Sequence, residues 1–147
     1  MTRKQCLNIS SRRYDALIGV GGMGFGQFFA LDGNHTLGRE ESRSGRFMDR
    51  CDYCKLHIIS HYVHTLLGTD FASYPIGRLG KDEPGDRILR EVQNIGMDTR
   101  FIEQAEGEQT LFSFCFIYPD GSGGNLTTNN SASGNITTAD VAQTEKI

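Results

Sequence analysis

"GKDEPGDRILREVQNIGMDT", residues 80–99, predicts the best-defined helix of the chain. Asp82 stands where an N-cap residue accepts free backbone N–H groups, and Pro84 falls in the first turn, where its missing N–H costs nothing. Gly96 supplies a common helix end. Because acidic side chains are stabilised near a helix N-terminus, we interpret the carboxylates of the first turn as capping groups and not as metal ligands. The predicted core positions are Ile88, Leu89, Val92 and Ile95.

A strand–helix–strand unit precedes this helix. "YDALIGV" (residues 14–20) is almost continuously apolar, which is typical of a strand in the middle of a sheet covered on both faces. "FASYPIGRL" (71–79) predicts a second strand, and residues 52–67 between them carry apolar side chains at helical spacing up to Gly68. Two strands joined by a helix are parallel, so the sequence predicts an α/β fold.

Two hairpins are expected in addition to this unit. The first follows the turn signal at Asp32-Gly33-Asn34, after the short apolar run 27–31. The second begins with "QTLFSFCFIY" (109–118) and returns through the turn "PDGSGG" (119–124). Its first strand alternates, which places four aromatic side chains on one face: Phe112, Phe114, Phe116 and Tyr118.

The composition favours a single soluble domain. The chain has 147 residues, a net charge of −3, 37% hydrophobic residues and no Trp. This charge gives no basic excess to neutralise a phosphate backbone, so we expect no nucleic-acid partner. No apolar run approaches the length of a membrane span or a signal peptide, and we therefore expect a cytoplasmic protein with no membrane association. Residues 1–13 are predicted to be a flexible N-terminus.

The glycines after the first strand match a dinucleotide fingerprint only in part. Gly19, Gly21 and Gly24 satisfy G-x-G-x-x-G, and Glu40 and Glu41 lie at the spacing expected for a ribose contact. The fingerprint also needs a helix that starts inside the glycine loop, whereas this loop leads to a hairpin. We therefore expect no NAD or FAD binding, and interpret the glycines as sites of close backbone approach to a strand or a small polar ligand.

The order of these motifs resembles the ribokinase-like (PfkB) family of carbohydrate kinases. The matching residues are "YDALIGVGG", the hairpin region, the helix closing on "LLG", the block 80–99, the strand from Thr110, and "DGSGGN" leading to "TTADV". The resemblance covers residues 14–141. It implies an α/β sandwich with a mostly parallel sheet and flanking helices, plus a β-hairpin lid formed by residues of about 28–50 and 109–128.

The resemblance also implies an activity and partners. The family transfers the ATP γ-phosphate, with Mg²⁺, to a hydroxymethyl group of a sugar or nucleoside. In several relatives the lid also meets a second subunit, so a homodimer through the lid hairpin is a further expectation. Candidate substrate-binding residues are those matched to the family's sugar site or lid: Gly22, Gly24, Cys54, Lys55, Phe114 and Asn125.

The sequence also departs from the family pattern. The segment after the first strand has no sugar-binding Asp, and the family's Gly-Gly pair and Asn align with Cys54, Lys55 and Ile59. The 147 residues contain neither the G-A-G-D segment that supplies the catalytic Asp and anion hole nor an N-x-x-E motif. We therefore expect an amino-terminal part or a truncated reading frame of a kinase, with no catalytic residue or ATP and Mg²⁺ site of its own, and inactive alone.

Two other functions fit parts of the sequence. The aromatic hairpin could make the chain a non-catalytic binding or oligomerisation module. Thiol and imidazole groups at zinc-ligand spacing form C-x₂-C-x₂-H-x₃-H-x₂-H, although ligands crowded on one helix cannot easily surround a tetrahedral ion. The zinc alternative uses Cys51, Cys54, His57, His61 and His64.

Overall fold

The chain folds into two sheets, in a computed structural model that describes residues 7, 11 and 13–147. The first sheet has three parallel strands in the order β1-β4-β5, formed by Ala16–Val20, Ala72–Gly80 and Ile102–Ala105. Helices α1 (Lys55–Leu67) and α2 (Glu83–Asn94) pack on it. This layer confirms the predicted strand–helix–strand unit and the α/β class.

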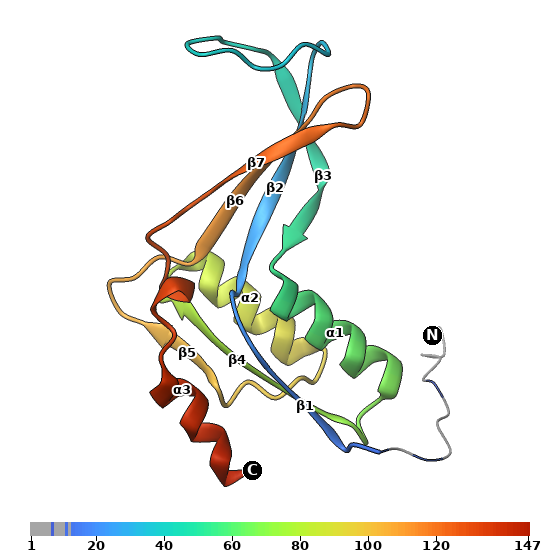
Figure 1. Cartoon of the computed structure of the whole chain (residues 1–147), viewed down its shortest axis with the longest axis vertical. Helices are drawn as coiled ribbons and strands as arrows, with labels where there is room; N and C mark the ends of the chain where they lie inside the picture. The colour runs from blue at the N-terminus through green and yellow to red at the C-terminus, as the bar shows by residue number, and fades with distance from the viewer. Residues whose placement is uncertain (1–6, 8–10, 12) are drawn as a thin grey trace.

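The second sheet projects from one end of the α/β layer (Figure 1). This projecting sheet has four strands in the order β3-β2-β6-β7. The two predicted hairpins pair antiparallel, as β2 with β3 and β6 with β7. They are joined by parallel pairing of β2 with β6, a contact that the sequence did not predict. The strands are Gly24–Leu31 (β2), Gly45–Tyr53 (β3), Leu111–Ile117 (β6) and Gly123–Thr127 (β7).

The end of the described chain returns to the α/β layer. The one-turn 3₁₀ helix η1 (Ala132–Asn135) contacts β4 and is followed by α3 (Thr138–Ala142) and η2 (Gln143–Lys146). Ser133 ties this segment to the turn between β1 and β2, because its Oγ accepts from Met23 N at 3.1 Å and donates to Met23 O at 2.9 Å. The turn is therefore held from both sides, by β1 and by η1.

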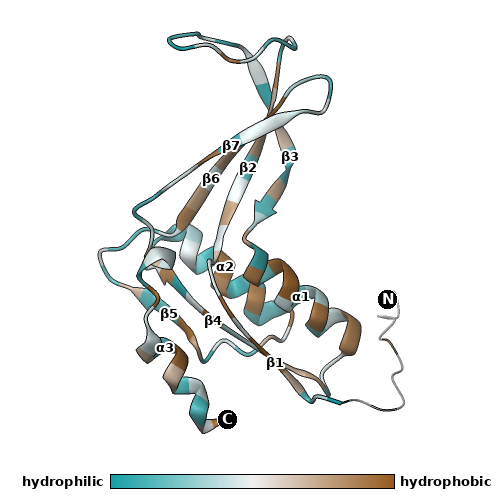
Figure 2. Ribbon diagram, viewed as in Figure 1, coloured by the Kyte–Doolittle hydropathy of each residue, from teal (hydrophilic) through white to brown (hydrophobic). Residues whose placement is uncertain are grey.

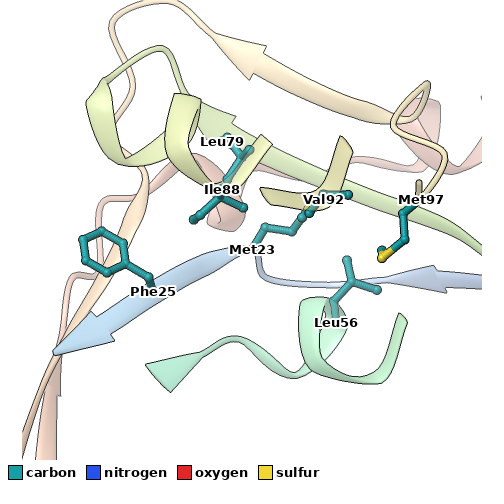
Figure 3. Packing of buried hydrophobic residues seen from close by; sticks show 7 residues of the cluster. All are labelled: Met23, Phe25, Leu56, Leu79, Ile88, Val92 and Met97. Atoms are coloured by element: carbon teal, nitrogen blue, oxygen red, sulfur yellow. The ribbon is translucent and has the colours of Figure 1, made fainter. Parts of the chain in front are cut away.

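One cluster of buried apolar side chains joins the two helices to both sheets. Met23 is fully buried and reaches toward Val92 of α2, with Leu56 of α1 on its other side (Figure 3). An added Cβ on Gly77 would lie 2.6 Å from the Met23 sulfur, so β4 needs a glycine where this side chain crosses it. The buried members are Met23, Phe25, Leu56, Leu79, Ile88, Val92 and Met97.

Two sequence predictions differ from the structure. The helix expected over residues 52–67 begins at Lys55, because Asp52 and Tyr53 pair with Gly26 and Phe25 as the end of β3. β1 was expected to be a central strand covered on both faces. It lies instead at the edge of its sheet, and two of its apolar residues are half exposed, Ile18 to 50% and Val20 to 57%. Figure 2 shows the apolar colouring of this strand.

Two further predictions concern the ends of the fold. Of the segment 1–13, predicted to be flexible, only residues 7, 11 and 13 are described. The loop that joins β2 to β3 is largely hydrophilic (Figure 2) and begins at the predicted turn, where Gly33 has a φ of 78°. This positive φ explains the glycine in the turn signal.

The carboxylate of Asp82 joins the two sheets at the start of α2. Oδ1 accepts from Gly85 N at 2.9 Å, which confirms the predicted N-cap. Oδ1 also accepts from Thr110 Oγ1 at 2.6 Å and Oδ2 from Thr110 N at 2.8 Å, just before β6 begins. Thr110 Oγ1 in turn accepts from Gly80 N at 3.0 Å, at the end of β4. Three elements therefore meet at one carboxylate.

Asp82→Ala is expected to lower the free energy of unfolding by about 2–4 kcal/mol, because it removes a cap and two bonds to a charged group. Urea denaturation followed by circular dichroism measures the change. The matched control is Asp120→Ala, since the printed hydrogen bonds of the Asp120 carboxylate come from Ser122 of its own exposed turn. We expect this control to cost less than about 1 kcal/mol. Equal losses in the two variants would contradict the assigned role of Asp82.

The same comparison has a pH dependence. Burial raises the pKa of Asp82, but the hydrogen bonds from Thr110 and Gly85 outweigh it and hold the pKa below the ordinary 3.8. A carboxyl group with a lowered folded-state pKa stabilises the fold above its unfolded pKa, and the stabilisation disappears as the pH falls through the folded value. The difference in the free energy of unfolding between wild type and Asp82→Ala should therefore reach its full value above about pH 5 and decrease below about pH 4.

Candidate functional site

A cavity of about 550 Å³ opens where the projecting sheet meets the α/β layer. One wall is the turn after β1, from Gly19 to Gly22, and the second is the start of α1. The third wall is one face of the projecting sheet, with Asp52 of β3, Ser113 of β6 and Asn125 of β7. Most of the lining is apolar or glycine, with a few polar groups placed around it, which is the usual character of a small-molecule site.

The glycine turn allows close approach of the backbone to α1. An added Cβ on Gly19 would lie 2.8 Å from Leu56 Cδ1, so a larger residue would require the Leu56 side chain to move. An added Cβ on Gly22 would lie 3.8 Å from the Cys54 sulfur, which is an ordinary contact distance. The loop continues into strand β2 and not into a helix, as the sequence predicted. These glycines therefore bring α1 and the cavity together.

The N-terminus of α1 faces the cavity. Cys54 occupies the N-cap position, but its side chain makes no capping hydrogen bond. Burial, and then the charge of Asp52, raise the pKa of the Cys54 thiol. The thiol is therefore protonated at neutral pH and acts as a small lining group, not as a nucleophile. Lys55 begins the helix and also lines the cavity.

The projecting sheet contributes most of the polar side chains. Asp52 Oδ2 accepts a weak hydrogen bond from the Cys115 thiol at 3.7 Å. Ser113 and Thr127 share a hydrogen bond between their hydroxyls at 2.9 Å, across β6 and β7. A carboxylate has about four lone-pair sites, so Asp52 keeps acceptor capacity toward the cavity.

Ser60 adds a buried hydroxyl on the α1 wall. It is 1% exposed and lines the cavity, and its Oγ has no hydrogen-bond partner among the described residues. A buried polar group without a partner costs about 1–3 kcal/mol. A hydroxyl or amine from a ligand is one source of the missing hydrogen bond.

Four of the six candidate substrate-binding residues line this cavity. These are Gly22, Cys54, Lys55 and Asn125. Gly24 is not among the lining residues, and its Cβ position is filled by Leu111 where β2 pairs with β6. Phe114 is also absent from the lining, because its ring packs with Phe29 on the other face of the projecting sheet.

Sequence reasoning missed Asp52, the carboxylate in the cavity. The helical pattern was extended over residues 52–67, which treated Asp52 as a helix residue. The signal that could have placed it is the hairpin, since Gly26 pairs with Asp52 across β2 and β3. Ile59, aligned with the family's Asn, does line the cavity, but it offers only an apolar side chain.

The zinc alternative is not supported by the geometry. No group of three or more His, Cys, Asp or Glu side chains among residues 7, 11 and 13–147 is placed to hold a metal ion. The Nε2 atom of His64 is bonded to Ile95 O at 2.8 Å. The ring of His57 packs against Tyr53 and His61, and Cys51 lies on strand β3 rather than on the helix. The three histidines lie on the side of α1 that faces α2, where each is engaged in ring packing or a hydrogen bond, and Cys51 belongs to another element.

Comparison with solved structures identifies the architecture. Ribokinase from Giardia lamblia matches with a TM-score of 0.67 at 19% identity over 86% of this chain and 39% of that one. Fructokinase from Xylella fastidiosa matches with a TM-score of 0.60 at 12% identity, over 86% and 36%. The fold is ribokinase-like. The expected α/β sandwich with its projecting β-hairpins is confirmed.

A third ribokinase-like structure has a ligand. The nucleoside kinase from Burkholderia thailandensis, in complex with inosine, matches with a TM-score of 0.59 at 15% identity, over 77% of this chain and 36% of that one. The chain thus spans about two fifths of the length of these ribokinase-like proteins. Comparisons with protein-family models and with curated proteins give no match. No described helix is long and apolar enough to cross a membrane.

Ser60→Ala is expected to raise the free energy of unfolding by about 1 kcal/mol, because it removes a buried hydroxyl that has no partner. The matched control is Ser113→Ala, which leaves the Thr127 hydroxyl without its partner and should lower stability by about 1 kcal/mol. Urea denaturation of both variants measures the two changes. A destabilised Ser60→Ala variant would show that the hydroxyl is already satisfied and would contradict this account of the cavity.

Proposed function

We propose that this chain forms the acceptor-substrate site and the lid of a carbohydrate or nucleoside kinase. The observation that carries the proposal is the cavity between the glycine turn, the start of α1 and the projecting sheet, in a fold shared with ribokinase, fructokinase and nucleoside kinase structures. A sugar hydroxymethyl group would be the phosphate acceptor.

The cavity chemistry suits a polyhydroxylated ligand. Asp52 would accept a hydrogen bond from a sugar hydroxyl, and the Asn125 amide would donate or accept another. Ser60 Oγ, which has no partner, would pair with a third polar group. Leu17 and Leu56 offer apolar surface to the C–H face of a sugar ring. This combination fixes the orientation of a ligand through a few polar groups on an apolar wall.

The side chains of the described residues do not fit Mg²⁺, because no group of three or more His, Cys, Asp or Glu is placed to hold a metal ion. A fructokinase structure with bound ATP is among the similar folds. In this chain, the described residues hold no acidic cluster suited to a divalent cation, and the sequence has no G-A-G-D segment. Phosphoryl transfer depends on positioning and charge stabilisation by such groups. We propose that the groups for phosphoryl transfer come from another polypeptide segment.

We expect the purified chain to bind a pentose, a ketohexose or a nucleoside and to consume no ATP. Asp52→Ala should weaken binding at least about tenfold, because a hydrogen bond to a charged group contributes about 1.5–3 kcal/mol. Titration calorimetry with a panel of these compounds measures the affinity. The control is Asp70→Ala, an exposed carboxylate that does not line the cavity. Absence of saturable binding by the folded wild type would overturn the proposal.

A second candidate function rests on the other face of the projecting sheet. The rings of Phe29 and Phe47 meet at 5.1 Å between centroids, and Phe114 lies 5.6 Å from Phe29. Phe47 is 62% exposed and Leu126 of the neighbouring β7 is 67% exposed. We call these four residues the aromatic patch. Exposed apolar patches mark interaction surfaces, so the patch supports the alternative of an oligomerisation module and a homodimer through the lid.

Phe47→Ser is expected to shift a self-associating chain toward monomer, because it removes a ring that stands mostly in solvent and adds no cavity to the core. Phe114→Ser should act in the same direction, as Phe114 packs in the same patch. Sedimentation velocity at tens of micromolar measures the association. Ile18→Ser is the control, since Ile18 is 50% exposed but lies on β1. Dissociation by Ile18→Ser alone would assign the interface to the sheet edge.

A further inference from the structure

A second cavity lies on the opposite side of α1, between α1, α2 and the end of β3. Its volume is about 470 Å³. Its lining includes Tyr53, His57 and His61 on one side and Glu91 and Asn94 of α2 on the other. The remaining lining residues are Ile58, Tyr62 and Ile95.

The aromatic walls are ordered by contacts with each other. The His57 ring lies edge-on to Tyr53, with centroids 4.7 Å apart, and is stacked with His61 at 6.0 Å and an interplanar angle of 22°. Rings in such arrangements present flat apolar surfaces. The rings of Tyr53 and His61 are partly exposed, so a planar ligand can pack on them.

The polar groups of this cavity are only partly satisfied. His57 is 4% exposed, and its Nδ1 atom has no hydrogen-bond partner among the described residues. Burial and the neighbouring His61 lower the pKa of His57, so its ring is neutral at neutral pH. A neutral imidazole has one nitrogen that donates a hydrogen bond and one that accepts. A buried nitrogen without a partner is destabilising, and a ligand that bonds to it gains binding energy.

Glu91 provides a carboxylate on the facing wall. Burial, and then a hydrogen bond with Glu91, raise the pKa of Tyr53 to about 12. The phenol therefore stays protonated and donates to the carboxylate. Arg87 approaches the same carboxylate at 3.7 Å along the helix. A carboxylate has about four lone-pair sites, so Glu91 can also accept an N–H group from a ligand.

We propose that this cavity is a second ligand site, which takes small planar nitrogen heterocycles carrying an N–H donor. The rings of Tyr53, His57 and His61 would pack on the faces and edges of the heterocycle. Glu91 would accept from its N–H, and His57 Nδ1 would pair with a ring nitrogen or N–H. Tyr53 also lines the candidate substrate cavity, so the two sites share one side chain.

The test uses 2-aminobenzimidazole as the probe and the ¹H–¹⁵N spectrum of the ¹⁵N-labelled 147-residue chain. We expect saturable shifts with a Kd below about 1 mM, centred on the lining residues of α1 and α2. His57→Phe keeps a ring of similar size and removes Nδ1, and should weaken binding about tenfold. His35→Phe is the control, since His35 lies in an exposed loop and should leave the Kd unchanged.

A second pair of variants covers the case in which His57→Phe does not fold. Glu91→Gln keeps the shape of the side chain and removes its charge, and should weaken binding at least about threefold. Its control is Glu106→Gln, an exposed residue that pairs with Lys81 outside both cavities. Absence of saturable shifts in the folded wild type would overturn the proposal. Shifts centred instead on Gly22 and Cys54 would also overturn it, because the probe would then occupy the candidate substrate cavity.

Discussion

The carboxylate of Asp82 is the interaction on which the arrangement of this molecule depends. It caps α2 and holds Thr110, which in turn accepts from the end of β4, so the parallel sheet, a helix and the projecting sheet share one hydrogen-bonded junction. The junction has no room for larger neighbours, since a Cβ on Gly85 would meet Gly80 O and one on Gly80 would meet Glu108 O. The G-x-D-x-x-G pattern of residues 80–85 is therefore a packing requirement.

The candidate substrate cavity lies where the projecting sheet (Figure 1) meets the α/β layer. It is bounded by the start of α1, the turn after β1 and one face of the projecting sheet. Met23 and its bonds to Ser133 hold that turn in place. Phe25 and Leu56 belong both to the apolar core and to the cavity lining, which gives the cavity a fixed wall.

Helix α1 serves two cavities because its faces differ. Leu56, Ile59 and Ser60 face the candidate substrate cavity, whereas His57 and His61 face the second one. The histidines that resemble a zinc motif in the sequence thus lie on the side of α1 that faces α2, as groups for ring packing and hydrogen bonding. Their spacing reflects the period of the helix, and His64 Nε2 is hydrogen-bonded to Ile95 O at the end of α2.

Much of the fold could be predicted from the sequence, since its signals are local. The cap at Asp82, the glycine at the turn of the first hairpin and the alternation of Phe112 to Tyr118 each depend on residues a few positions apart, and each predicts its element correctly. The order of these elements also indicates the ribokinase-like fold. Four of the six candidate residues line the cavity, because the family pattern locates the start of α1 and the second hairpin.

The tertiary structure alone decided the rest. Pairing of Gly24 with Leu111 joins two hairpins that are far apart in the chain, and the pairing of Gly26 with Asp52 turns that carboxylate into the cavity. The edge position of β1, the placement of Phe114 on the outer face and the missing partners of Ser60 and His57 have the same origin. Helix caps and turns are set by neighbours in sequence, whereas strand register and burial are set by packing between distant segments.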